Sequence, residues 1–260
     1  MEAIGVIPAR YKSSRFEGKV LADILGKPLI QYVWQQAKGA KLLDEVIIAC
    51  DNEKVKEVAE CFGAKVVMTA KEHLSGTDRI AEVVALMDVK VVVNIQADEP
   101  LIQPVMIDSI VDTLLNDKGL EMASLMKRIT DLKEIEDPNV VKVVVDKNNF
   151  ALYFSRAPIP YKTKDSEVKE AVYFKHIGIY GYTKDFLFTY KNMGVSLLEA
   201  TEKLEQLRVL YEGFKIKMLE TKYDTISVDT SEDLEKVKAY LKRSQILDPK
   251  SSTNSDDASS

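Results

Sequence analysis

The sequence predicts an α/β protein in which helices cover a parallel sheet. Strand-like and helix-like segments alternate from the first residues onward, as they do in proteins whose parallel strands are joined by helical crossovers. Residues 91–95 form an almost wholly apolar run, which is typical of a central strand buried on both faces. At 260 residues, the chain is long enough for one large domain or for a domain with an appended lobe.

The first half of the chain carries this alternation. Its strand-like segments are short and apolar, and its helical segments repeat apolar residues every three or four positions, as Ile80, Val83, Val84 and Met87 do. We expect strands over residues 3–8, 45–50, 65–68 and 91–95. We expect helices over residues 28–38, 52–62, 80–87 and from Pro104 to about 115.

After about residue 116, the pattern changes to strands that are linked by turns, with residues 146–149 as a hairpin tip. Thr230 is placed to cap a last helix, whose first turn carries Glu232 and Asp233. The remaining expected elements are strands over residues 122–129, 140–146, 150–155, 174–182, 214–219 and 225–228 and a helix over 197–211.

These elements predict one folded unit. We assign residues 1–247 to a single α/β domain, within which a lobe at about 122–219 stands apart from the alternating first half. Residues 248–260 lack apolar periodicity and are expected to be a disordered tail.

Charge and composition exclude several classes of protein. Lys and Arg number 36 and Asp and Glu 41, so that the net charge is −5. An acidic chain with local basic loops favours a small anionic ligand over non-specific nucleic-acid binding. No apolar run reaches the ~18 residues of a membrane span, and the N-terminal residues enter a strand pattern without a signal segment. We therefore expect a cytoplasmic protein that binds neither nucleic acid nor membrane.

Cysteines and histidines are few and scattered. The chain has only Cys50, Cys61, His73 and His176, which argues against structural zinc and against a disulfide framework. Cys50 ends a predicted strand, where it acts either as a functional thiol or, as the pattern favours, as a small apolar residue.

A basic loop follows the first strand. Residues 10–19 carry Arg10, Lys12, Arg15 and Lys19 together with hydroxyl and glycine residues, at the edge where an open α/β sheet binds its ligand. Backbone N–H groups and these cations suit a polyphosphate. The alternative is a solvated basic loop, which the strand before it and the helix after it make less favourable.

Two acidic motifs complement this loop. Asp98 lies in the QADEP motif at the carboxyl end of the central strand, and Asp229 lies just before the last helix. Carboxylates beside a polyphosphate are the protein ligands that Mg²⁺ uses, because it keeps most of its waters. Each motif alone also fits a solvated turn, but together with the basic loop they predict a phosphate and metal site.

Seven motifs, in order along residues 3–241, resemble the 3-deoxy-manno-octulosonate (Kdo) cytidylyltransferase family. No single motif is decisive, and their order is what makes the resemblance specific. They are IPARYKSSRFEGK (7–19), SGTDR (75–79), QADEP (96–100), ALYFSRAPIP (151–160), KHIGIYGY (175–182), LEQLRVL (204–210) and VDTSEDL (228–234).

The resemblance implies a Rossmann-like nucleotidyltransferase fold, of the nucleotide-diphospho-sugar transferase type, with a smaller sugar-binding and dimerisation lobe. It implies a homodimer, Mg²⁺ as cofactor, and transfer of CMP from CTP to Kdo for lipopolysaccharide synthesis. The implied catalytic residues are Arg10, Lys19 and Asp98, and the implied metal ligands are Asp98 and Asp229. The implied nucleotide site consists of Pro8, Ala9, Arg10, Ser13, Lys19 and Ser75, and the implied sugar site of Gln96, Arg156, His176, Tyr180, Glu205 and Gln206.

Some of these residues also have ordinary structural interpretations. By sequence alone, His176 fits a strand histidine with a structural partner, and Glu205 fits the solvated face of a helix. The apolar residues of the lobe, among them Phe154, Phe174, Phe186 and Phe188, predict that this region supplies the dimer contact.

Two departures from the family pattern concern the substrate. Ala97 stands where the family usually has Gly, and Glu17 places a negative charge in the phosphate loop. They leave the class of reaction unchanged but leave the sugar open, with 8-amino-Kdo as one alternative. Two further alternatives are a cytidylyltransferase for another acidic sugar, such as a sialic acid, and an inactive protein that binds a nucleotide sugar. The paired carboxylates argue against the last alternative, because a binding module does not need them.

Overall fold

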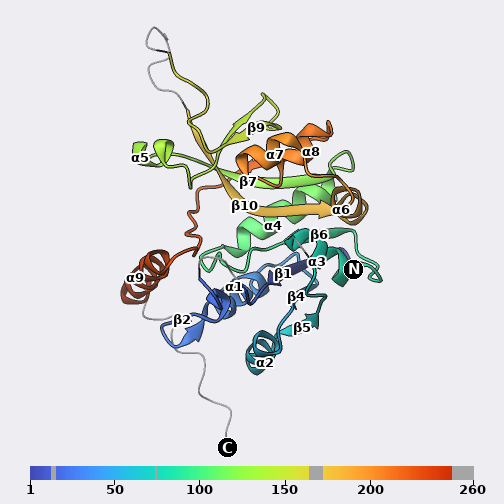
Figure 1. Cartoon of the computed structure of the whole chain (residues 1–260), viewed down its shortest axis with the longest axis vertical. Helices are drawn as coiled ribbons and strands as arrows, with labels where there is room; N and C mark the ends of the chain where they lie inside the picture. The colour runs from blue at the N-terminus through green and yellow to red at the C-terminus, as the bar shows by residue number, and fades with distance from the viewer. Residues whose placement is uncertain (13–15, 74, 164–171, 248–260) are drawn as a thin grey trace, which may run out of the picture.

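The computed structural model describes residues 1–12, 16–73, 75–163 and 172–247, and Figure 1 shows their arrangement. The predicted tail at 248–260 and the predicted site residue Ser13 lie outside the described residues. The strands are β1 (Ala3–Ala9), β2 (Asp23–Ile24), β3 (Lys27–Pro28), β4 (Glu45–Cys50), β5 (Lys65–Met68), β6 (Val91–Asn94), β7 (Met122–Arg128), β8 (Lys142–Val145), β9 (Ala151–Ser155), β10 (Phe174–Thr183) and β11 (Lys217–Glu220).

The helices confirm the alternation in the first half of the chain. Pro104 occupies the first turn of α4, as expected, and Asn52 caps α2 by accepting a hydrogen bond from Lys54 N. The helices are η1 (Lys19–Leu21), α1 (Leu29–Lys38), α2 (Glu53–Cys61), α3 (Gly76–Val84), α4 (Pro104–Asn116), α5 (Leu132–Glu136), α6 (Lys184–Lys191), α7 (Leu197–Glu202), α8 (Leu207–Tyr211) and α9 (Ser231–Leu247).

A mixed sheet forms the centre of the molecule. Its order is β11-β7-β10-β6-β1-β4-β5, and the four strands from β6 to β5 are parallel, as the sequence predicts. β10 runs antiparallel between β6 and β7, and the β8–β9 hairpin joins the sheet through β10. The carboxyl ends of β1 and β6 are therefore neighbours at the middle of the sheet, where ligands of open α/β folds bind.

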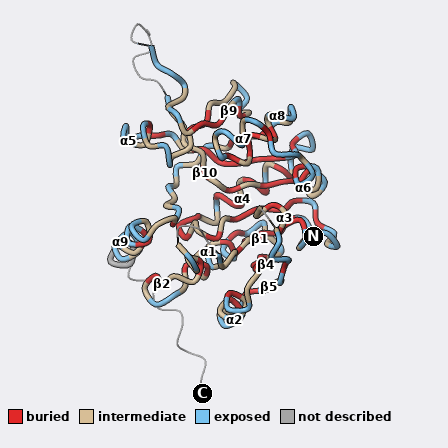
Figure 2. Tube along the Cα trace, viewed as in Figure 1, coloured by how far each residue is buried: buried red, intermediate tan, exposed pale blue. Residues whose placement is uncertain are grey.

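Apolar residues cover both faces of this sheet. In β1, Ile4 and Val6 pack in one cluster with α3 and α6, whereas Ala3 and Ile7 pack in the other with α1, α2 and α4. This alternation follows from the two-residue period of a strand. Figure 2 shows buried residues concentrated along the strands, so the loops at the carboxyl ends are held by a rigid scaffold.

Three expectations for the second half of the chain were wrong. The helix expected over residues 197–211 is broken into α7 and α8, because Lys203 adopts a left-handed backbone with φ of 57°. Residues 225–228 form no strand but an extended connection, in which Val228 N donates to Asp98 O at 2.9 Å. Phe154 and Phe186 are 0% and 2% exposed and belong to the core, so they cannot supply a dimer contact.

Helix α6 and the short α5 were not expected from the sequence. Thr183 caps α6 through Phe186 N, and the aromatic residues of that helix fill the core beneath β10.

Among the described residues, no helix is both long and apolar enough to cross a bilayer.

The close packing of α4 on β10 depends on Gly181. A Cβ at this position would lie 2.3 Å from Ile110 Cγ2 and 2.8 Å from Leu114 Cδ1. We therefore expect Gly181→Ala to lower the free energy of unfolding by about 1–3 kcal/mol, because the helix must move away from the sheet. Gly178→Ala, in the same strand with no atom within 4 Å of the added Cβ, is the matched control and should change it by less than about 0.5 kcal/mol. Denaturant unfolding measures both, and equal losses would contradict this account.

Candidate active site

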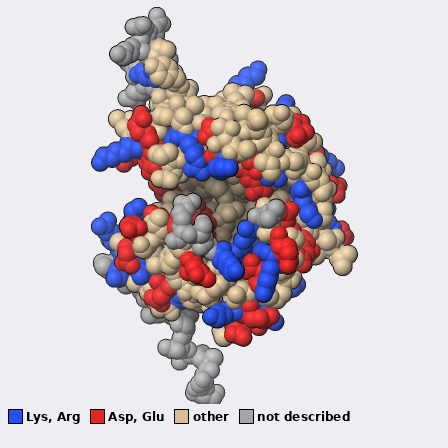
Figure 3. All heavy atoms as spheres, viewed as in Figure 1, with Lys and Arg blue, Asp and Glu red and all other residues tan. Residues whose placement is uncertain are grey.

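A cavity of about 760 Å³ lies where the segment after β6 meets β10 and the segment that leads into α9. The face drawn in Figure 3 is hollowed at its centre, and side chains of both charges border the hollow. A second cavity of about 330 Å³ adjoins it, because Gly76, Gln96 and Asp98 line both. Volumes of this size suit small-molecule substrates.

Lys19, Asp98 and Asp229 meet at the junction of the two cavities. Lys19 Nζ lies 2.6 Å from Asp98 Oδ2 and 3.0 Å from Asp229 Oδ1, and it also donates to Val228 O at 3.1 Å. Burial lowers the pKa of Lys19, but the two carboxylates outweigh it and raise this pKa above the ordinary value. The structure thus brings Lys19 of the basic loop (residues 10–19) together with both predicted metal ligands.

Glu99, the neighbour of Asp98, is a residue that the sequence argument missed. Its Oε2 is inaccessible and has no hydrogen-bond partner among the described residues. Burial, and then the charge of Asp98, raise the pKa of Glu99 to about 8. Glu99 is therefore largely protonated at pH 7, which limits the negative charge beside the paired aspartates.

The smaller cavity brings together part of the predicted nucleotide site. Pro8, Arg10 and Lys19 line it, together with Lys12, which was not among the predicted residues. Ala9 is instead fully buried in the core. Ser75 caps α3 through a reciprocal pair of hydrogen bonds with Asp78, so its hydroxyl is already used.

Both departures from the family pattern fit the structure. Ala97 is 7% exposed and lines the smaller cavity, and it is not among the residues with positive φ, so its methyl group causes no backbone strain. Glu17 is exposed, where solvent screens its charge.

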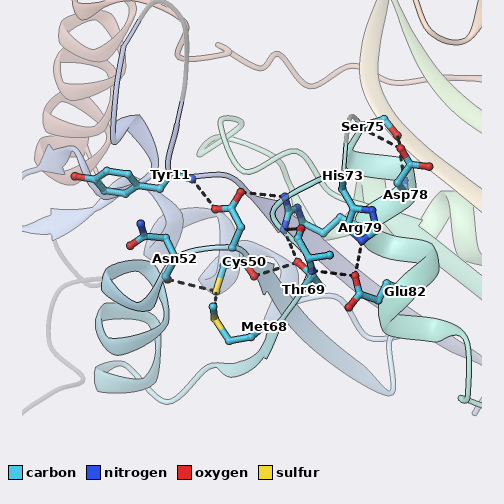
Figure 4. A network of polar contacts seen from close by, with 12 residues as sticks. Tyr11, Cys50, Asn52, Met68, Thr69, His73, Ser75, Asp78, Arg79 and Glu82 are labelled. Atoms are coloured by element: carbon cyan, nitrogen blue, oxygen red, sulfur yellow. Dashed lines mark hydrogen bonds and ion pairs between the residues drawn. The ribbon is translucent and has the colours of Figure 1, made fainter.

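Asp51 anchors the start of the basic loop. Its Oδ1 accepts from Tyr11 N at 3.2 Å, and its Oδ2 accepts from Arg79 Nη2 at 3.0 Å. Arg79 on α3 is fully buried and also donates to Ala70 O at 3.3 Å and to Thr69. Figure 4 shows Tyr11 and Arg79 joined through this network, so the loop enters the site from a position fixed by the end of β4 and by α3.

The larger cavity gathers every predicted sugar-site residue. Burial lowers the pKa of His176 to about 3, so its imidazole is neutral at pH 7, and burial raises the pKa of Tyr180. Glu205 lies in the break between α7 and α8, where burial raises its pKa and Thr77 Oγ1 donates to its Oε1 at 3.0 Å. The six residues along its wall are Gln96, Arg156, His176, Tyr180, Glu205 and Gln206.

Arg156 is held in place by Glu202. The Arg156 guanidinium donates to Glu202 O through Nε at 2.9 Å and to Pro138 O through Nη1 at 2.9 Å. The Glu202 carboxylate accepts from Arg156 N at 3.0 Å and from Ser155 Oγ at 2.6 Å. These contacts fix the direction of the guanidinium at the cavity wall.

Sequence reasoning missed several residues of this cavity besides Glu99. Thr77 and Glu99 lie inside the SGTDR and QADEP motifs, so the motifs contained the information needed to find them. Tyr182 and Tyr190 also line the cavity: Tyr182 is the last residue of the KHIGIYGY motif, whereas Tyr190 lies in a segment that was left without assignment.

Comparison with known proteins agrees with the geometry. The cytidylyltransferase family model matches residues 4–218. A 3-deoxy-manno-octulosonate cytidylyltransferase from Solibacter usitatus is 50% identical over 93% of this chain and 95% of its own length. Its counterpart from Geotalea uraniireducens is 47% identical over 94% of this chain and all of its own length. The chain belongs to the 3-deoxy-manno-octulosonate cytidylyltransferase family.

Solved structures agree with this membership. A CMP:2-keto-3-deoxy-manno-octonic acid synthetase, solved as a complex with CTP, has a TM-score of 0.88 and 41% identity over 94% of this chain and all of its own. A cytidylyltransferase from Leptospira borgpetersenii has a TM-score of 0.62 at 16% identity over the full length of both chains, which shows a shared fold. The predicted Rossmann-like nucleotidyltransferase fold is therefore confirmed.

Proposed function

We propose that this protein transfers CMP from CTP to Kdo and releases diphosphate. One observation carries the proposal: two adjoining cavities place cationic and carboxylate groups beside a wall suited to a polyhydroxylated acid. The anomeric hydroxyl of the sugar attacks the α-phosphorus of CTP, a P–O bond forms to the sugar, and the bond to diphosphate breaks. Such transfers depend on positioning and electrostatics rather than on a nucleophilic side chain.

The smaller cavity is proposed to hold CTP. Arg10 and Lys19 lie on its wall and are suited to the triphosphate, because their charges offset that of the departing diphosphate. Pro8 and Gly76 both line this cavity and pack closely, since a Cβ on Gly76 would lie 3.3 Å from Pro8 Cγ. We expect the cavity to hold a pyrimidine base in preference to a purine.

Asp98 and Asp229 are proposed to hold Mg²⁺. Their oxygens fit a hard cation, because both lie within hydrogen-bond distance of the single ammonium of Lys19 and so converge on one point. Bound there, Mg²⁺ supplies charge for the α-phosphate and lowers the pKa of the attacking hydroxyl.

The wall of the larger cavity is proposed to hold Kdo. Arg156 is suited to the C1 carboxylate, because its charged guanidinium keeps hydrogens on Nη1 and Nη2 beyond those that Glu202 and Pro138 accept. Neutral His176 and Tyr180 and the half-buried Glu205 are suited to the hydroxyls of the sugar, with Gln96 and Gln206 at the cavity wall.

The proposal includes the setting of the reaction. CMP-Kdo is a precursor for lipopolysaccharide, and we place the enzyme in the cytoplasm. Cys50 and Cys61 are free thiols, which suits a reducing compartment.

The choice of sugar is tested by diphosphate release from CTP with Kdo, 8-amino-Kdo, a sialic acid and a hexose 1-phosphate. We expect Kdo to be the best substrate and the hexose phosphate to be poor, because it lacks the carboxylate that Arg156 is placed to bind.

Arg156→Gln should weaken sugar binding by ~1.5–3 kcal/mol with little effect on the KM for CTP. Arg128→Gln, on the exposed end of β7, is the control. Efficient transfer to the hexose phosphate would refute the Kdo assignment, whereas preference for 8-amino-Kdo would change only the named sugar.

The metal role is tested by Asp98→Asn. We expect turnover to fall by about 10²–10³-fold, and to fall to background in the unaltered protein when Mg²⁺ is chelated, because a charge that stabilises the transition state is lost. Asp88→Asn, an exposed change at the opposite end of β6, is the matched control. Thermal shifts on adding Mg²⁺ and CTP report binding separately from turnover. Near-normal turnover of folded Asp98→Asn without added metal would exclude the role.

We also propose a homodimer. The support comes from exposed apolar residues of the lobe, where Leu152 is 62% exposed and Tyr161 82% exposed. We expect light scattering at micromolar concentration to give twice the chain mass and Leu152→Asp to shift it toward the monomer. A monomer mass for the unaltered protein would contradict the proposal.

A further inference from the structure

A bulge in β10 lies beside His176. The pairing of β10 with β7 shifts register between Ile177 and Tyr180, so β10 carries two extra residues there, Gly178 and Ile179, opposite the consecutive β7 residues Leu125 and Ser124. Ser124 on β7 is fully buried, and its hydroxyl lies against this bulge. Its Oγ lies 2.9 Å from His176 Nε2, 2.8 Å from Ile179 O and 3.3 Å from Ile177 O.

The hydroxyl of Ser124 has one hydrogen for these three neighbours. The two carbonyl oxygens accept only, whereas Nε2 either accepts or donates according to the tautomer of the ring. If the hydroxyl donated to Nε2, its oxygen would face Ile179 O at 2.8 Å with no hydrogen between them, and their lone pairs would repel. If it donates to Ile179 O instead, its lone pair accepts from a hydrogen on Nε2, and both close contacts are satisfied.

We propose that Ser124 is a positioning residue that holds His176 in the Nε2–H tautomer, so that Nδ1 offers a lone pair to the substrate. Phe154 and Tyr180 hold the ring at centroid distances of 5.0 and 5.4 Å, which fixes its orientation at the cavity wall. The neutral state follows from burial, which lowers the pKa of His176 to about 3 and leaves a choice between two neutral tautomers.

The tautomer has a consequence for how the substrate is oriented, and this step rests on the proposed function. An acceptor lone pair binds a sugar hydroxyl, which donates, and repels a carboxylate oxygen, which cannot donate. The guanidinium of Arg156, on the same wall, has the opposite preference. The two residues together admit a polyhydroxylated acid with its carboxylate at Arg156 and a hydroxyl at His176.

The tautomer is measured by ¹⁵N NMR of protein labelled in its histidines. The chain contains only His73 and His176, so His73→Gln assigns the spectrum. We expect His176 to show a protonated Nε2 and an unprotonated Nδ1 at pH 7. A protonated Nδ1 in the unaltered protein would overturn the proposal, and this result does not depend on any variant or on activity.

The role of Ser124 is tested by Ser124→Ala, which removes the acceptor. We expect the Nδ1–H form to become populated and the KM for the sugar acid to rise roughly 2- to 10-fold, the size of one neutral hydrogen bond, with the KM for CTP unchanged. Ser155→Ala removes another buried hydroxyl near the cavity and should leave the tautomer unchanged. An unchanged tautomer in Ser124→Ala would refute the role of Ser124. If no sugar acid is turned over, the proposed function fails, while the NMR result still decides the tautomer.

Discussion

The ion pairs of Lys19 are the interaction on which the arrangement of the site depends. One ammonium joins the loop after β1, the QADEP segment that follows β6 and the segment before α9, which are up to 210 positions apart in sequence. Two carboxylates this close would repel each other without a cation between them. Lys19 supplies that cation in the free protein, so the two carboxylates that we propose as metal ligands are held together before any substrate binds.

The sheet topology explains why these segments meet. Parallel pairing of β1 with β6 places their carboxyl ends side by side, and antiparallel β10 then brings His176 and Tyr180 to the same edge. The connection to α9 is held at two points: Asp224 pairs with Lys127 and Lys175 on the lobe, and Val228 N bonds to Asp98 O. Figure 1 shows this connection running from the second half of the chain back to α9, near the N-terminal half. Both halves therefore set the position of Asp229.

The elements that could be predicted from the sequence are those set by nearby residues, such as strands and helix caps. The strands around β1, β4 and β6 follow from short apolar runs, and the cap at Thr230 follows from the residues beside it. The break at Lys203 was not predictable, because a non-glycine residue in the left-handed region gives no composition signal; Lys203 N ends α7 by donating to Glu199 O at 2.7 Å. The hydrogen bond between Ser124 and His176 joins residues 52 positions apart through a bulge, and no local pattern encodes such a pairing.

Burial divides the site into two electrostatic environments. At the phosphate end, Lys19, Asp98 and Asp229 balance one another in direct contact, and nearby Glu99 is largely protonated at pH 7. At the sugar end, burial lowers the pKa of His176 and raises the pKa of Tyr180, so both are neutral. Neutral groups distinguish one hydroxyl from another through the geometry of their hydrogen bonds. Charges act over longer distances and depend less on that geometry. This separation agrees with the proposed function, in which charge is neutralised at one end of the site and, beside Arg156, neutral groups bind the sugar hydroxyls at the other.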